Sequence, residues 1–140
     1  AQEFQKELFE ALFDSKFEIA QFDEIVKDYT KRLFAGEFDQ KLVYKKRLGR
    51  NLNDYEKNIP PHVQAVKKHK AEHPDFEVRR GQIIEYVYAM SGAEIFNGKN
   101  ALNYPLYQQR QLVPISAAIF DALVIDNKKN NLGQLFLPDF

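Results

Sequence analysis

The spacing of apolar residues constrains the fold of this chain more than any other feature, because its period changes part-way along. Apolar side chains recur at helical spacing over residues 2–13, and again over residues 18–35. Lys31 and Arg32 suit the last turn of the second helix, and Gly36 is a natural stop for it. Two amphipathic helices joined by a short link predict an antiparallel pair.

After these helices, the side-chain pattern changes from helical spacing to a period of two, which is typical of a β-strand. Residues 41–48 (KLVYKKRL) predict a strand in which Leu42, Tyr44 and Leu48 share one face, while Val43, Lys45 and Arg47 share the other. Residues 83–89 (IIEYVYA) are rich in β-branched and aromatic side chains and predict a second strand. Between the strands, Pro60-Pro61 opens a predicted helix over residues 62–72.

The C-terminal part returns to helical spacing. Residues 91–101 contain two glycines and predict a loop. A helix is expected to begin near Tyr104, with Asn103 as its cap and a kink at Pro114. We therefore expect a predominantly helical α+β fold. Its parts are an N-terminal antiparallel helix pair, a small two-stranded β element, a C-terminal kinked helix and a flexible tail.

The last residues differ in character from the rest. Residues 126–131 (DNKKNN) form a polar spacer, and a short apolar end follows. Gly133 and Pro138 are expected to keep that end out of the preceding helix. The predicted organisation is a folded domain over residues 1–125 and a tail over residues 126–140.

Composition excludes several classes of protein. The length of 140 residues favours a single domain, and the absence of cysteine removes disulfides, thiolate nucleophiles and cysteine-ligated zinc. A reducing, cytoplasmic location is expected. No apolar run approaches the roughly 18 residues of a membrane-spanning helix. Ala1 has no signal peptide before it, so the chain is interpreted as a processed product or an excised piece.

The net charge of zero hides a strong segregation of charge along the chain. Residues 1–40 hold ten acidic and five basic side chains, whereas residues 41–80 hold eleven basic and five acidic ones, together with all three histidines. Residues 81–140 are nearly balanced. Local asymmetry of this kind indicates polyanion binding better than the total charge does.

Motifs for catalysis are weak. Residues 69–73 (HKAEH) match the H-x-x-E-H zinc pattern. However, Pro74 ends the helix at the second histidine, and the surrounding lysines oppose a dication, so no metal site is predicted. A Gly-rich phosphate loop, a G-x-S-x-G turn and an Asp-x-Asp pair are all missing from the sequence. We expect no catalytic residue and no cofactor in this chain.

The basic segment predicts a nucleic-acid interface. Its cations gather on the first strand and the turn after it, and directly before the second strand, with aromatic rings interleaved. The start of a helix, where His62 lies, also favours a phosphate. The candidate DNA-binding residues are Lys45, Lys46, Arg47, Arg50, Tyr55, His62, Arg79 and Arg80. Phosphate contacts position a duplex without specifying its sequence. A solvated basic face without a partner is the alternative.

Ordered motifs across the chain identify a family resemblance. The quoted residues are Val43, Lys45, Leu48, Asp54-Tyr55, Pro61-His62-Val63 and Ala65, then Gly81, Ile84 and Tyr86-Val87, then Tyr104, Tyr107, Gln111-Leu112 and Pro114. They resemble the thumb region of family B DNA polymerases: a basic strand, a D-Y pair, P-H-V-x-x-A, G-x-x-I-x-Y-V and Y-x-x-Y-x-x-x-Q-x-x-P. One departure is Asn103, where the family usually has Asp, and both residues can cap a helix.

The resemblance implies a role. The thumb grips the primer–template duplex behind the active site, with Lys45, Arg47, Tyr55 and His62 as its best contact candidates. The catalytic aspartates lie in the palm and the proofreading carboxylates in the exonuclease domain, so the parent polymerase would use magnesium outside this fragment. The implied partners are duplex DNA and the palm, at the nucleoid.

The tail resembles the Gln-Leu-x-Leu-Phe peptide with which bacterial polymerases dock on the sliding clamp. The predicted clamp-binding residues are Gln134, Leu135, Leu137 and Phe140. Phe140 follows Leu137 after two intervening residues, where the usual pattern puts the aromatic next. An apolar tail packed on its own domain is one alternative. A helical protein-interaction module that binds no DNA, with a partner reached by the tail, is another.

Overall fold

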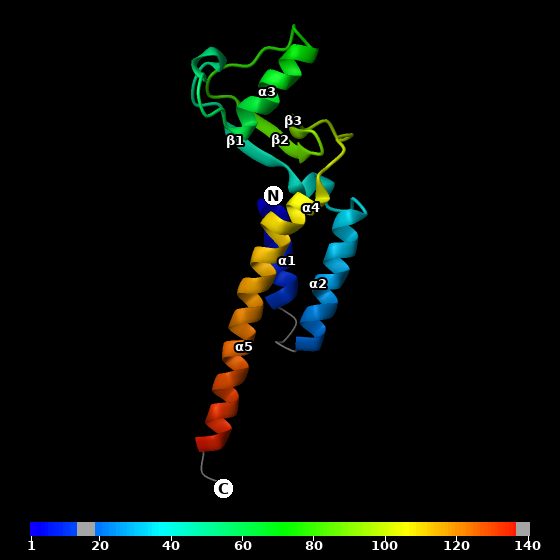
Figure 1. Ribbon diagram of the computed structural model, residues 1–140, viewed down its shortest axis with the longest axis vertical. Helices are drawn as coiled ribbons and strands as arrows, with labels where there is room; N and C mark the ends of the chain where they lie inside the picture. The colour runs from blue at the N-terminus through cyan, green and yellow to red at the C-terminus, as the bar shows by residue number, and fades with distance from the viewer. Residues whose placement is uncertain (14–18, 137–140) are drawn as a thin grey trace.

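The computed structural model of the chain describes residues 1–13 and 19–136, with side-chain burial for residues 1–13 and 20–125. The described part forms two lobes along one long axis (Figure 1). A helical lobe holds α1 (Gln2–Phe13), α2 (Ile19–Phe34) and α5 (Val113–Phe136). A sheet lobe holds β1 (Tyr44–Arg47), α3 (Pro61–Glu72), β2 (Ile83–Ala89) and β3 (Gly92–Ile95). The short helix α4 (Tyr104–Tyr107) lies where the lobes meet.

The helical lobe confirms the predicted antiparallel pair, since α1 and α2 run in opposite directions in Figure 1. Its core takes one stripe from each helix, and Phe4, Leu8, Leu33 and Leu123 are fully buried in it. Gly36 ends α2 as expected. Its φ of +83° suits glycine, and a Cβ at that position would lie 3.1 Å from the Tyr104 hydroxyl oxygen.

The sheet has three antiparallel strands in the order β1-β2-β3, so the two-stranded prediction was one strand short. The missed strand, β3, lies in the segment predicted as a loop. Only four residues long, it is too short to show a period, and its first residue, Gly92, has a φ of +116°. β1 is also shorter than predicted, because Asp39–Leu42 form a 3₁₀ turn (η1) that buries Leu42.

A second core lies between the sheet and α3. The β2 side chains Ile84 and Tyr86 face Val63 and Val66 of α3, while Val87, on the opposite face of β2, belongs to the helical core. Tyr44 packs against both cores, and Tyr107 of α4 accepts a hydrogen bond from the Tyr88 amide at 2.9 Å. These contacts join the two lobes.

Glu94 fastens the β2–β3 hairpin to α3. Its carboxylate accepts hydrogen bonds from Lys68 at 2.8 Å, from Ser91 at 2.7 Å and from Asn100 at 2.9 Å. The bond from Lys68 is the main cause that lowers the pKa of Glu94 to about 2. Glu94 is therefore ionised through the physiological range and acts as a structural anion.

The C-terminal helical segment is longer and less regular than predicted. Asn103 caps α4 as expected, since its side chain accepts a hydrogen bond from the Leu106 amide at 3.2 Å. The irregularity expected around Pro114 takes the form of a π-helical turn, η3 (Gln108–Leu112), directly before α5. Pro114 lacks an N–H, so a regular helix would leave the Arg110 carbonyl without its usual donor there.

The prediction that the apolar end stays out of the preceding helix was wrong for its first residues. α5 continues through the polar residues 126–131 and past Gly133 to Phe136. A single glycine costs a helix only about 1 kcal/mol relative to alanine, and Pro138 comes two residues after Phe136, the last helical residue that the structure describes. Leu137 and Phe140 lie outside the described residues. Among the described helices, none is both long and apolar enough to cross a membrane.

Candidate nucleic-acid interface

The exposed face of the sheet carries the central cations. β1 pairs with β2 so that Lys45 lies opposite Glu85 and Arg47 opposite Ile83. Since side chains alternate along a strand, these four residues share the face away from α3, whereas Lys46 points to the α3 side. All three cations are exposed, so exposure does not alternate along β1. The pairing with β2 confirms the prediction that Lys45 and Arg47 share one face.

A turn brings two more arginines to the end of β1. Arg47 donates from Nη1 to the Gly81 carbonyl at 2.8 Å. The backbone also closes there, with the Leu48 amide donating to Gln82 and the Gly81 amide donating to Leu48. Gly81 has a φ of +90°, which suits glycine in this tight connection. The exposed side chains of Arg79 and Arg80 therefore lie beside the end of β1.

Arg50 and Tyr55 form a separate unit after the strand. The Arg50 guanidinium carbon lies 5.9 Å from the centroid of the Tyr55 ring, a cation–π distance. Tyr55 is half-buried, and its carbonyl accepts a hydrogen bond from Lys67 at 2.8 Å. Lys67 and Lys68 are thus both engaged within the fold, while Lys70 is exposed.

His62 does not lie on this surface. The residue is 4% exposed, and its ring centroid is 6.4 Å from those of both Tyr55 and Tyr86. Burial, and secondarily the charge of Lys46, lower the pKa of His62, so the neutral imidazole is favoured. The expectation that its side chain meets a phosphate disagrees with this buried position. His62 and Val66 are four residues apart and so share the inner side of α3.

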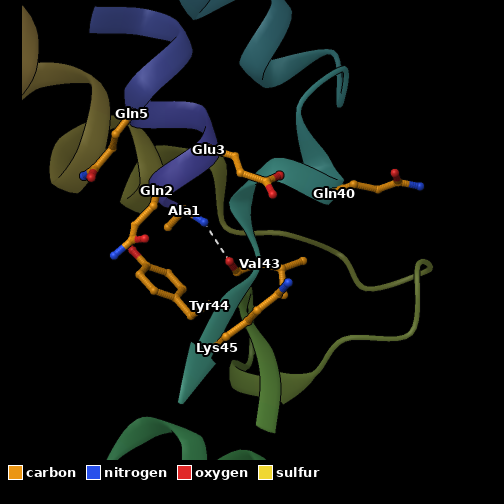
Figure 2. A pocket seen from close by; sticks show the side chains of 8 residues that line it. All are labelled: Ala1, Gln2, Glu3, Gln5, Gln40, Val43, Tyr44 and Lys45. Atoms are coloured by element: carbon orange, nitrogen blue, oxygen red, sulfur yellow. Dashed lines mark hydrogen bonds between the residues drawn. The ribbon is translucent and has the colours of Figure 1, made fainter. Parts of the chain in front are cut away.

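A pocket extends the cationic face toward the helical lobe (Figure 2). It lies where the first turn of α1 meets β1, and its polar lining comprises Gln2, Glu3, Gln5, Gln40, Tyr44 and Lys45. The Ala1 amine donates a hydrogen bond to the Val43 carbonyl at 2.6 Å, which holds α1 against the start of β1. Polar side chains therefore continue from the exposed strand face onto α1.

The histidine motif forms no metal cluster. The His69 and His73 rings lie 4.5 Å apart between centroids, and His69 also packs edge-on against Phe76 at 4.5 Å. Within the part of the chain that the structure describes, no group of three or more histidine, cysteine, aspartate or glutamate side chains is arranged to hold a metal ion.

Comparison with known proteins identifies the family. The family model described as "DNA polymerase family B" matches residues 2–130. The chain belongs to this family. Family B membership thus accounts for the ordered motifs on β1, α3, β2 and α4.

A family B enzyme of known sequence is similar over almost the whole chain. DNA polymerase II of Escherichia coli is 37% identical over an alignment of 143 positions. The alignment covers 98% of this chain and 18% of that protein. The family B DNA polymerase of the archaeon Pyrobaculum calidifontis has a similar fold, with a TM-score of 0.64 and 22% identity. That match covers 84% of this chain and 17% of the archaeal one. The chain therefore spans less than a fifth of either relative.

Two residues of the exposed strand face were missed by the sequence reasoning. Ile83 is 53% exposed, and Glu85 lies with its Oε1 at 3.9 Å from the Lys45 Nζ. The period of two along residues 83–89 signals that both share a face. Only the register of β1 against β2 shows that this face is the one that carries Lys45 and Arg47.

Proposed function

We propose that this chain is the thumb domain of a family B DNA polymerase and grips the primer–template duplex by its phosphate backbone. One observation carries the proposal: the exposed cations of β1 lie beside the turn that bears Arg79 and Arg80, in a chain of this family. The acidic helices α1 and α2 belong to the other lobe, and α1 meets the basic segment at its start, where Glu7 pairs with Lys41 and Glu3 lines a pocket together with Lys45.

The strand geometry suits a polyanion. Residues on one face of a strand repeat about every 6.6 Å. Lys45 and Arg47 are therefore far enough apart for each to meet a different phosphate of a duplex, whose charges are closely spaced along both strands. Arginine adds a forked donor that matches phosphate oxygens, and lysine adds a compact point charge. Such contacts position the duplex independently of its sequence.

The proposal assigns catalysis to other parts of the parent polymerase. We propose that nucleotidyl transfer and 3′–5′ proofreading, with their magnesium ions, take place in its palm and exonuclease domains. This chain then contributes affinity and alignment of the duplex, in contact with the palm. The expected location is the cytoplasm, at the nucleoid.

Binding should depend steeply on salt. We expect the chain to bind a fluorescein-labelled primer–template weakly, because the palm surface is absent, with measurable affinity at about 50 mM salt that falls about tenfold or more by 200 mM. The reason is that each neutralised phosphate releases condensed counterions. Fluorescence anisotropy over a salt series measures this. Affinity that is independent of salt, or no binding at low salt, would refute the proposed role.

The tail is proposed as a sliding-clamp peptide. Gln134 and Leu135 lie in the last turn of α5. Support comes from the sequence likeness and from the position of α5 in Figure 1, where its C-terminal end extends beyond α1 and α2. A short peptide with a polar head and apolar anchors fits a preformed pocket, and tethering raises the effective concentration of polymerase at DNA.

Deleting residues 134–140 should separate the two activities. We expect the truncated chain to keep the duplex affinity of the full chain, because the cations of β1 are untouched, and to lose binding to a bacterial sliding clamp. Fluorescence anisotropy measures the duplex affinity, and surface plasmon resonance measures binding to the clamp. Replacing Asp121 with Asn, on the exposed side of α5, serves as a control for each assay. Retained clamp binding would refute the tail assignment. Lost DNA binding would show that the tail, rather than the cations of β1, carries the duplex affinity, whereas a full chain that binds the clamp but no DNA would favour the interaction-module alternative.

A further inference from the structure

The exposed face of the sheet is not purely basic. Glu85 lies on β2 directly opposite Lys45 of β1, on the face that also carries Arg47, and its side chain is 54% exposed. An acid in the middle of a phosphate-binding face works against the binding that its neighbours support. Its position therefore calls for a physical reason.

The Lys45–Glu85 pair is loose. The Nζ and Oε1 atoms are 3.9 Å apart, beyond hydrogen-bond distance, and the Lys45 side chain is 62% exposed. Exposed pairs of this kind contribute little to stability and exchange partners readily. Glu94 shows the contrast, since three donors hold its carboxylate in place. Glu85 therefore does not fasten elements of the fold together in the way that Glu94 does.

An arriving phosphate changes the balance at this pair. The phosphate replaces Glu85 as the partner of Lys45, and the carboxylate then faces a second anion. At about 0.1 M salt, charges within roughly 10 Å still act on each other, so Glu85 repels the phosphates held by Lys45 and Arg47. When the phosphate leaves, Glu85 again neutralises Lys45. The carboxylate therefore competes with DNA for the same cation.

We propose that Glu85 limits the lifetime of the duplex complex, so that the sheet face releases and rebinds phosphates as DNA moves past it. The proposal rests on the proposed duplex-binding function and adds a regulating residue to that surface. Among variants of a single interface, differences in affinity arise more from the dissociation rate than from the association rate. Glu85 thus sets how long each contact lasts.

The test compares Glu85→Gln with wild type and with Glu24→Gln, a matched loss of one exposed acid on α2 in the other lobe. Glu85→Gln should tighten primer–template binding about three- to tenfold at ~50 mM salt, chiefly through slower dissociation. Anisotropy gives the affinity, and stopped-flow competition with unlabelled duplex gives the rate. Glu24→Gln should match wild type, and thermal unfolding should be the same for all three chains.

The outcomes distinguish this inference from the proposed function. A wild-type chain that fails to bind duplex at low salt overturns the function and the inference with it. A wild-type chain that binds, with Glu85→Gln no tighter, overturns the inference alone. Equal tightening by Glu24→Gln would also overturn it, because the effect would then come from total charge rather than from the place of Glu85 opposite Lys45.

Discussion

Replacing Lys45 and Arg47 together with glutamine should weaken primer–template binding by about 10- to 100-fold at ~50 mM salt. The two side chains share the exposed face of β1, so both are expected to reach phosphates of the same strand. The slope of log affinity against log salt should fall by about two, because about 0.9 counterions are released for each phosphate neutralised. Fluorescence anisotropy over a salt series measures both quantities.

The matched control is Lys27→Gln with Lys31→Gln, which removes the same charge from exposed positions of α2. This pair should leave the affinity within about twofold of wild type, since α2 belongs to the helical lobe and not to the sheet that carries Lys45 and Arg47. Equal weakening by the two double variants would mean that only net charge matters. Arg47→Gln also removes the hydrogen bond to Gly81, so circular dichroism should confirm that the fold is intact.

The arrangement of Lys45 and Arg47 on one face could be predicted because a strand obeys a local rule. Side chains alternate, so the sequence of residues 44–47 is enough to place both cations together. The acid opposite them could not be placed in this way. Glu85 meets Lys45 through the register of two strands nearly forty residues apart, and register depends on how both strands bury their apolar faces.

The burial of His62 was predictable in principle. His62, Val63 and Val66 fall at spacings that put them on the buried side of α3, and the buried set contains all three. A helix start favours a phosphate, but packing of the inner side of α3 against the sheet decides where His62 lies. The extension of α5 through residues 126–131 has a related cause, because a polar composition does not by itself prevent a helix.

Phe38 is a core residue that no periodic pattern signals, because it lies between α2 and η1. Its ring is 2% exposed, stacks on Tyr29 at 5.4 Å and packs against Phe4 at 5.0 Å. It therefore ties α1 and α2 to the segment that leads into β1. The Arg32 guanidinium carbon also lies 4.8 Å from the ring centroid.

Phe38→Ala should lower the free energy of unfolding by about 3–5 kcal/mol, since it removes a buried aromatic ring and leaves a cavity among rings that cannot close around it. Urea denaturation followed by circular dichroism measures this value. Phe9→Ala is the matched control, because Phe9 is 49% exposed on α1 and should lose less than about 1 kcal/mol. If the two variants lose similar amounts, Phe38 does not join the helices. A loss within the predicted range, with Phe9→Ala near wild type, would support Phe38 as the buried ring that packs α1 and α2 against the segment leading into β1.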